Sequence, residues 1–554
     1  MRYYLNKSMP IENDCASRGL NGGYAEKYKC YKECEPYKEP VVKISNMYSH
    51  SYEFRNSRAV TQAEIAVSRE KATARVRHLL REWDGSLVCL SMNIPGAYKQ
   101  FPLASLCFAE CRRITEITLE AGGFKFAAQD TLKQDSTGDR AYYLVDGKPE
   151  EIKKLLCEVE DNHPLGRLFN IDLFARCAAD TGNIGNISRI GRAGDAGYTG
   201  IHNIRKITRA AIGKEERLCM LCDKYAFTCQ HARMHSMDEL VSNMLDIMWS
   251  WVRNYLSERV NSTAMRALCC ELATTPKPGL VDRMNCGAHT DMDFFTFIDS
   301  MSELLPFFQE CAVTGFDCAS ISLNTRFYGS GCEYVEPPLL LKAIRGAGEL
   351  AHAKMIRVTG GANTHKGLIF SLGILCAAYG WLVRTKTIFT MGELFDLCRD
   401  ISMPVMSELA EMSIEDARTN GEKVYARYGF TGIRGEVSHG FASVRKYSLP
   451  MLCSMLERGH TMNDAGIAAF IALLAHVDDT TILHRSNAET LRDIQQAAAD
   501  FLASGPAMSE IKKWAHETDR QFIERNISAG GCADLLAVTF FVWHLFKGYS
   551  PGGF

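Results

Sequence analysis

The 554-residue chain lacks an excess of charge of either sign. Its 63 Lys and Arg residues balance 65 Asp and Glu residues, for a formal net charge of −2. The chain as a whole therefore has no electrostatic drive toward nucleic acid or an anionic membrane, and any use of charge must be local. Neither an internal repeat nor a low-complexity tract is visible. With 46% apolar and 23% charged residues, the composition excludes collagen-like, coiled-coil and wholly disordered proteins.

Long apolar runs are also scarce. The first ten residues lack the continuous apolar region of a secretory signal peptide, so we expect none. The longest uncharged apolar stretch, residues 367–383, contains three glycines and falls short of the roughly 20 residues that span a bilayer. We therefore expect no membrane association and interpret this stretch as a helix buried in a large helical domain.

Cysteine, in contrast, is present at 21 positions. Without a signal peptide, this number predicts mostly free thiols in a reducing cytoplasm rather than a disulfide framework. One group has the spacing Cys-x2-Cys-x6-Cys and is followed by two histidines. A structural zinc is one interpretation of this group, and free thiols on a short helical hairpin are the other. The candidate zinc ligands are Cys219, Cys222, Cys229 and His235.

The residue patterns divide the chain into three parts. Residues 1–60 show no sustained apolar period, which predicts a poorly ordered extension. Residues 61–238 combine helical patterns at 59–83 and 103–121 with strand patterns at 86–93, 141–145 and 167–174, which predicts an α+β domain with a modest sheet. Residues 239–554 contain long helical runs and predict one large all-α domain.

Loops of the helical part are rich in groups that bind metal and phosphate. In residues 271–293, two prolines flank Lys277, which stiffens the loop and predicts that the lysine is presented to a ligand. The carboxylates nearby are hard ligands for Mg²⁺, and cationic side chains bind phosphate oxygens. The alternative is a solvated loop with ordinary capping residues.

Further loops repeat this chemistry. Residues 360–367 (GGANTHKG) open an apolar helix and resemble an anion-binding helix start, although the spacing is not that of a P-loop. A simple helix-entry turn is the alternative. Residues 432–440 place an arginine and a glutamate between glycines, 476–485 carry paired aspartates, and 530–534 place a carboxylate at a helix start. Together the loops predict an acidic, glycine-lined site between helices.

In the α+β part, residues 163–174 (HPLGRLFNIDLF) form a turn that leads into a strand carrying Asp172. A strand carboxylate facing a phosphate-binding turn is typical of nucleotidyl-type transferases that hold Mg²⁺. Residues 181–235 contain nine Lys or Arg against four Asp or Glu. This local excess suits a triphosphate or an acidic protein, with a solvated helix surface as the alternative.

Residues about 240–554 resemble the triphosphoribosyl-dephospho-CoA synthase of the citrate lyase accessory system. The resemblance rests on TTPKPGLVDRMNCGAHTDMD, GGANTHKG, GIRGEVSHG, HVDDTTILHR and GGCADLLA, in that order. Residues about 85–236 resemble the citrate lyase apo-acyl-carrier phosphoribosyl-dephospho-CoA transferase, also called the holo-carrier synthase, through SMNIPGAYKQ, HPLGRLFNIDL, ISRIGR and RLCMLC with the later Cys and His. The chain thus resembles a fusion of the two enzymes.

The synthase resemblance implies that ATP and 3′-dephospho-CoA are joined with release of adenine. The dephospho-CoA 2′-hydroxyl attacks the anomeric carbon of ATP, which calls for a carboxylate base and Mg²⁺ on the retained triphosphate. The expected catalytic residues are Glu271, Glu436 and Asp478, either glutamate being the base. The expected phosphate contacts are Lys277, Arg283, His365, Lys366, Arg434 and Arg485, and the expected Mg²⁺ ligands are Asp282, Asp291, Asp293 and Asp479.

The transferase resemblance implies transfer of the phosphoribosyl-dephospho-CoA group to a serine of the citrate lyase acyl carrier protein (the gamma subunit), with release of diphosphate. Expected contacts are His163, Arg167 and Arg189, with Asp172 catalytic and binding Mg²⁺. The family usually has a second aspartate where this chain has Asn170, which weakens metal binding. The basic stretch is expected to dock the acidic carrier, and the chain can form an oligomer.

Three alternatives stay open. The N-terminal half can be a carrier-docking scaffold beside an active synthase. The helical site can belong to an ATP or ADP-ribose-type glycohydrolase in which water replaces the dephospho-CoA hydroxyl. A nucleic-acid-binding zinc knuckle at 217–235 is the third, and the balanced net charge argues against it.

Overall fold

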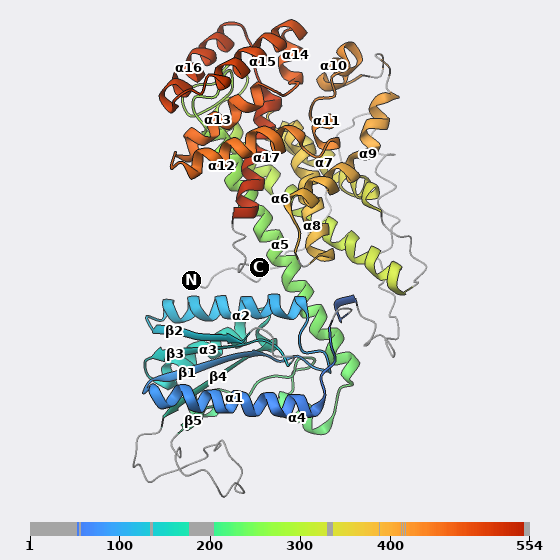
Figure 1. Ribbon diagram of the computed structural model, residues 1–554. Helices are drawn as coiled ribbons and strands as arrows, with labels where there is room; N and C mark the ends of the chain where they lie inside the picture. Colours follow the sequence, from blue (N-terminus) through green and yellow to red (C-terminus); the bar gives the residue numbers. More distant parts are fainter. Residues whose placement is uncertain are drawn as a thin grey trace, which may run out of the picture. The chain divides into compact units, whose positions relative to one another are not determined.

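The computed structural model describes residues 52–54, 57–132, 137–176, 204–328, 336–386, 388–411, 413, 415 and 417–547. All of them belong to one unit of the chain, Ser49–Phe554. The expected extension at residues 1–60 lies mostly outside the described residues. The first part of the described chain combines helices with a five-stranded sheet, and the remainder is helical (Figure 1), which confirms the predicted fold class.

The sheet has the strand order β2-β3-β1-β4-β5, and every neighbouring pair is antiparallel. Its strands are β1 (Ser86–Met92), β2 (Lys125–Leu132), β3 (Arg140–Asp146), β4 (Phe169–Arg176) and β5 (Ile204–Ile207). Helices α2 (Pro102–Ala121) and α3 (Pro149–Asn162) connect β1 to β2 and β3 to β4, which gives the split βαβ arrangement. Strands β1, β3 and β4 match predicted strands, whereas β2, β5 and α3 were not predicted.

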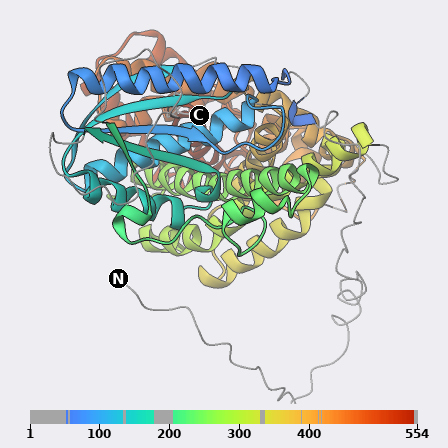
Figure 2. The ribbon, with the colours of Figure 1, turned by 90° about the horizontal axis from the view of Figure 1, so that it is seen from below.

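Helix α1 (Gln62–Glu82) covers one face of this sheet, and α2 lies on the opposite face (Figures 1 and 2). The buried residues Leu79 and Leu80 of α1 pack against Leu87, Tyr142 and Phe174 of three central strands. Side chains alternate along a strand, so Cys89 and Ser91 point to the same face as Leu87. The register places Asp172 opposite Cys89 and Asn170 opposite Ser91, and both therefore lie on the α1 side of the sheet.

Four short elements complete this part of the chain. The first, η2 (Tyr52–Phe54), precedes α1, and η3 (Gly166–Leu168) precedes β4, whereas η4 (Ala210–Ile212) and α4 (Ala226–Ala232) lie between β5 and the helical region. Helix α5 (Met237–Ala273) follows with a capping box between Ser236 and Glu239. The predicted domain boundary at 238–239 falls in the first turn of this continuous helix.

The helical region continues from α5. Its further helices are α6 (Phe294–Tyr328), α7 (Pro337–Val358), α8 (Lys366–Thr385), α9 (Met391–Ala410), α10 (Asn420–Tyr428), α11 (Gly432–Ser438), the π-helical segment η5 (Val444–Ser448), α12 (Leu449–Glu457), α13 (Met462–Leu474), α14 (Thr480–Arg485), α15 (Ala488–Ala503), α16 (Met508–Glu524) and α17 (Gly530–Lys547).

Helix α8 forms the centre of this region. By length and composition alone it could cross a membrane, but 78% of its most apolar window is buried inside the protein, as the sequence analysis expects. Its glycines allow close packing: a Cβ on Gly380 would lie 1.9 Å from the carbonyl oxygen of Ala312 in α6. In return, a Cβ on Gly315 of α6 would lie 2.0 Å from the carbonyl oxygen of Ala377. The two backbones therefore approach more closely than larger residues would permit.

Candidate active sites

A cleft of about 710 Å³ opens in the helical region, and all five predicted loops contribute to it. The last turn of α5 lies at one side of it, and five helices begin at it: α8, α10, α11, α14 and α17. Helix N-termini present free N–H groups and partial positive charge, which favours bound phosphates. The predicted residues that line the cleft are Glu271, Lys277, Asp291, His365, Lys366, Arg434, Glu436, Asp478, Asp479 and Arg485.

Lys277 is buried rather than presented, contrary to the sequence-based expectation. Its side chain is 1% exposed, and its ammonium group pairs with the carboxylate of Glu271 and donates to the Glu271 carbonyl at 3.0 Å. Burial raises the pKa of Glu271, while the charge of Lys277 opposes this rise. The loop returns to the last turn of α5, where the lysine holds the carboxylate in place at the wall of the cleft.

Two further buried carboxylates lie near Glu271. Asp479 caps α14 by accepting from the Thr481 amide at 2.8 Å, and it also accepts from the Cys532 amide of α17 at 2.8 Å. Asp534 has a pKa well above its usual range because of burial and the charges of Glu271 and Asp479. Three carboxylates near one lysine would carry an excess of negative charge once ionised, which a bound divalent cation would balance.

Asp534 was not among the predicted site residues, although its motif was noted. The structure shows its place through a neighbour: α8 has a glycine where this carboxylate lies. A Cβ on Gly367 would lie 2.1 Å from Asp534 Oδ2. Other lining residues that the sequence analysis missed are Asn363, Arg418, Thr480, Thr481 and His484, and no motif marks Arg418.

His365 is buried at the start of α8. Its Nδ1 lies 2.7 Å from Ser300 Oγ, and its Nε2 is buried without a hydrogen-bond partner among the described residues. Burial and the charge of Lys277 lower the pKa of His365 to about 3. The imidazole is therefore neutral at physiological pH, so it can hydrogen-bond a ligand but does not supply the positive charge expected of a phosphate contact.

The remaining lining residues are anchored by neighbours. Arg434 donates to Glu422 at 2.7 Å, and Glu436 accepts from the Ser443 hydroxyl at 2.6 Å. Arg485 donates to the carbonyl of Ala288 at 2.8 Å. Each side chain is thereby held in position before any ligand binds, which preorganises the cleft.

Asp282, Arg283 and Asp293 were predicted for the site but do not line the cleft. Asp282 is buried and accepts backbone amides of its own loop, including that of Lys277 at 3.0 Å. Asp293 is exposed and accepts from the Thr296 amide at the start of α6. Arg283 donates to Asn463 at 2.9 Å on the outer side of the loop. These three residues organise the loop and its neighbours.

In the sheet region, the predicted residues occupy separate places. Asp172 pairs with Lys206 at 2.7 Å, and Asn170 donates to Ser91 at 2.9 Å, both on the α1 side of the sheet. His163 instead lies 3.3 Å from Glu110 of α2 and stacks on Phe169. Arg167 donates to the carbonyl of Cys219 at 3.0 Å. Arg189 lies outside the described residues.

The expected basic surface is largely neutralised where the structure describes it. Arg205 pairs with Glu150, Arg209 with Asp161, and Lys214 with Glu158. Lys206 is used by Asp172, and Arg217 donates to backbone carbonyls of the turn before β4. Most of the described cations between residues 204 and 217 are therefore paired with acidic residues of the same region.

The four predicted zinc ligands do come together. The sulfur atoms of Cys219, Cys222 and Cys229 and a ring nitrogen of His235 all lie within 4.8 Å of one another. Cys222 Sγ is 3.4 Å from both Cys229 Sγ and His235 Nε2. A hairpin closed by the Leu218–Tyr225 bridge and the short helix α4 form this knuckle (residues 218–235).

Comparisons with known proteins find two families along the chain. A family model described as ATP:dephospho-CoA triphosphoribosyl transferase matches residues 257–552, and one described as apo-citrate lyase phosphoribosyl-dephospho-CoA transferase matches residues 60–189 and 179–251. Protein CitXG of Haemophilus influenzae is 29% identical over 487 residues, which cover 86% of this chain and 94% of that protein.

Further relatives match either the whole chain or its helical region. Protein CitXG of Leuconostoc mesenteroides is 27% identical over 83% of this chain and 91% of its own length. The 2-(5''-triphosphoribosyl)-3'-dephosphocoenzyme-A synthase of Klebsiella pneumoniae is 35% identical over 52% of this chain and 92% of its own length. The chain belongs to the ATP:dephospho-CoA triphosphoribosyl transferase family, joined in one polypeptide to an apo-citrate lyase phosphoribosyl-dephospho-CoA transferase region.

Proposed function

We propose that the 710 Å³ cleft is the synthase site of this bifunctional transferase. The protein makes triphosphoribosyl-dephospho-CoA from ATP and dephospho-CoA and transfers phosphoribosyl-dephospho-CoA to the acyl carrier protein of apo-citrate lyase. The observation that carries the assignment is the convergence of five separate loops on one cleft, with five helices beginning there. Its volume lies within the roughly 300–1,000 Å³ range of small-molecule sites.

Within this cleft we assign Glu271 as the general base for the attacking 2′-hydroxyl. Its burial moves the carboxyl pKa upward, toward the range in which a base works efficiently near neutral pH. Lys277 orients the carboxylate. Glu436 is held by Ser443 and is assigned a positioning role. The neutral imidazole of His365 can hydrogen-bond adenine as it departs.

Mg²⁺ would be held by carboxylates of the cleft: Asp479, Asp534, Asp478 and Asp291. When bound, it would neutralise charge on the triphosphate. Lys366 and Arg485 are the cationic groups at the cleft that can contact phosphate oxygens. Asp282 and Asp293 are not assigned as ligands, because both are engaged with backbone amides away from the cleft.

The knuckle is proposed to hold a structural Zn²⁺ through three cysteines and one histidine, a closed tetrahedral set. Its backbone supports two neighbours, because Arg167 donates to the Cys219 carbonyl and Asn243 of α5 donates to the Met220 carbonyl, both at 3.0 Å. The metal would therefore fix the turn before β4. The free state of the described cysteines and the thiolate ligands of such a site support a reducing, cytoplasmic location.

For the acyl carrier we propose docking at the knuckle. Its apolar side chains Leu218, Tyr225, Phe227 and Met234 are exposed, Phe227 by 68%. Lys224 and Arg233 lie exposed among them and can contact acidic groups of a carrier. Since the basic residues of 204–217 are mostly paired within the protein, apolar contact would contribute more than charge, and docking would depend only weakly on salt.

One experiment tests the two activities together. Apo-carrier is incubated with the full chain, ATP, dephospho-CoA and Mg²⁺, and its mass is measured along with released adenine. A shift to the holo-carrier mass is expected. Adenine release without the mass shift would support the scaffold alternative, and adenine release without dephospho-CoA would support a glycohydrolase.

A further inference from the structure

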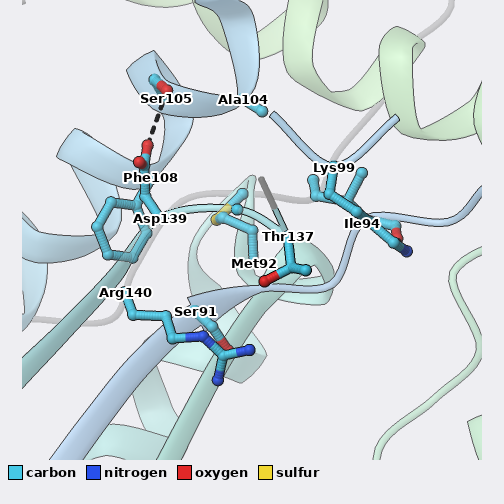
Figure 3. Close-up of a pocket in the computed structure, with 11 residues that line it drawn as sticks. Ser91, Met92, Ile94, Lys99, Ala104, Ser105, Phe108, Thr137, Asp139 and Arg140 are labelled. Atoms are coloured by element: carbon cyan, nitrogen blue, oxygen red, sulfur yellow. Dashed lines mark hydrogen bonds between the residues drawn. The ribbon is translucent and has the colours of Figure 1, made fainter. Parts of the chain in front are cut away.

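A small cavity of about 70 Å³ lies at the end of β1 (Figure 3). It is lined by Ser91 and Met92 of β1, by Lys99, by the first turns of α2, and by residues 137–140 leading into β3. A water molecule needs roughly 10–15 Å³ of such space, so the cavity can take a small polyatomic group but not a nucleoside.

Two cationic side chains line this cavity. Arg140 donates through Nη2 to Ser68 of α1 at 3.3 Å, while its buried Nε has no hydrogen-bond partner among the described residues. Lys99 donates to the carbonyl of Ile94, and burial together with the charge of Arg69 lowers its pKa. An unpartnered guanidinium N–H and a second cation lie in one cavity. Together they can bind an anionic ligand.

The start of α2 also favours a bound anion. Its N-cap residue Phe101 makes no side-chain cap, and its first turn contains no acidic residue. Pro102 at the first position has no N–H, so Leu103 and Ala104 carry the first-turn N–H groups without an intrahelical acceptor, and the helix dipole is positive at this end. The one acidic residue of the lining, Asp139, already accepts from Ser105 Oγ at 2.7 Å (Figure 3).

The cavity also adjoins the strands that carry the transferase residues. Ser91 lines the cavity and accepts from Asn170 at 2.9 Å, and Figure 3 shows Ser91 beside Arg140. Asp172 lies two residues further along β4, on the same face of the sheet. A phosphate chain bound in the cavity would thus extend toward Asn170 and Asp172.

We propose that this cavity binds the terminal phosphates of triphosphoribosyl-dephospho-CoA, and then the departing diphosphate, through Lys99, Arg140 and the start of α2. The inference rests on the proposed transferase function. In the transfer, the carrier serine oxygen bonds to the α-phosphorus and loses its proton to solvent. The bond from the α-phosphorus to the bridging oxygen of the β-phosphate breaks, and diphosphate leaves with the electron pair. Cations around that diphosphate stabilise the charge it gains.

The test uses the full chain with Lys99→Gln and Arg140→Gln, and Lys154→Gln of the exposed face of α3 as the matched control. Inorganic diphosphate binding is measured by calorimetry, and carrier transfer is measured with supplied triphosphoribosyl-dephospho-CoA. Both cavity variants should bind diphosphate about ten- to a hundred-fold more weakly, as expected for a lost charged hydrogen bond, and should raise the substrate KM similarly. Adenine release should stay at the wild-type rate in both, which shows that the chain is folded.

Conservative replacement separates a binding role from a structural one. Arg140→Lys should recover part of the diphosphate affinity, because it keeps the charge. Diphosphate affinity equal to wild type in both Gln variants would overturn the proposal. A wild-type chain that binds diphosphate but transfers nothing to the carrier would contradict the proposed function. It would still support the anion site, so the two failures are distinguishable.

Discussion

The helical cleft and the sheet region use charged residues in different ways. In the cleft, carboxylates and cations from five loops face one large space, and several of them are held by backbone amides or carbonyls. In the sheet region, most described cations near the predicted site pair with acidic residues of the same region, and the cavity is small. The comparison teaches that a local excess of charge in a sequence does not itself make a binding surface; what matters is which charges remain unpaired after folding.

The largest effect is expected from Glu271→Gln. Removing a general base lowers a rate by roughly 10²- to 10⁴-fold, so adenine release should fall by that factor. Transfer from supplied triphosphoribosyl-dephospho-CoA should continue, because Glu271 lies in the cleft of the helical region. Both rates are measured on the same preparation, with the exposed Glu524→Gln as control. Adenine release at the wild-type rate by the Glu271→Gln variant would show that Glu271 is not the general base.

The second-largest effect is expected from Gly367→Ala. The added methyl group would lie 2.1 Å from Asp534 Oδ2, so the carboxylate must move. We expect adenine release to fall by at least about tenfold, on the rule that misplacement by about 1 Å costs up to 10²-fold. The control is Gly348→Ala of α7, outside the cleft lining, where an added Cβ would lie 3.7 Å from its nearest neighbour, an ordinary contact. Equal rates for the two variants would contradict the tight contact.

Cys222→Ser tests the proposed zinc cluster of the sheet region by removing one ligand. Its sulfur is central to the four-residue cluster, so the variant should lose the bound zinc that mass spectrometry of the purified chain detects. Loss of a ligand should reduce carrier transfer, while adenine release persists. Cys269→Ser, at an exposed cysteine outside the cluster, is the control. A chain that contains no zinc even as wild type would exclude the metal.

A pH effect should distinguish the cleft from the sheet region. Because the pKa of Asp534 is raised in the folded state, the folded protein binds more protons than the unfolded chain above the ordinary carboxyl range. The contribution of Asp534 to stability should therefore fall as pH rises from about 4 through the raised pKa. Thermal melting should show this slope, and Mg²⁺ should offset it by binding the ionised carboxylates. Asp534→Asn should flatten the slope and weaken the response to Mg²⁺.

The smallest effect is expected from Asn170→Asp. A second carboxylate on β4 adds one charge near Asp172, which should increase the affinity for Mg²⁺ and lower the Mg²⁺ concentration that half-saturates transfer by a few-fold. Titrating Mg²⁺ in the carrier mass assay measures the change. A variant that needs as much Mg²⁺ as wild type would argue that Asn170, bonded to Ser91, acts only in the sheet.

The sequence predicted the fold class, the buried glycine-containing helix and the residues that meet at the cleft, because motif residues at helix starts keep their local roles after folding. It did not predict which carboxylates serve the loop itself. Asp282 and Asp293 are of the residue type that binds metals, but their carboxylates accept hydrogen bonds from backbone amides. Only the path of the folded chain decides which of these two roles a carboxylate has. Lys277 was expected to be presented and is buried for the same reason.

The sheet region was harder to predict for a related cause. Its ion pairs join residues far apart in the sequence, such as Lys214 with Glu158, so a count along the chain could not reveal them. The zinc cluster was easier, because its spacing is local. Asp534 was missed because a carboxylate at a helix start has an ordinary explanation; its contact with Gly367 appears only when α8 and α17 are placed together.

The contact between Gly367 and Asp534 also constrains how this fused gene can evolve. Every residue other than glycine places atoms where the carboxylate lies, so one nucleotide change at this codon can silence the synthase. The sheet region shares no residue with that contact and would keep its transferase. A lineage that obtains the prosthetic-group precursor from another enzyme could thus lose half of this protein's chemistry in a single step, without deleting any part of the chain.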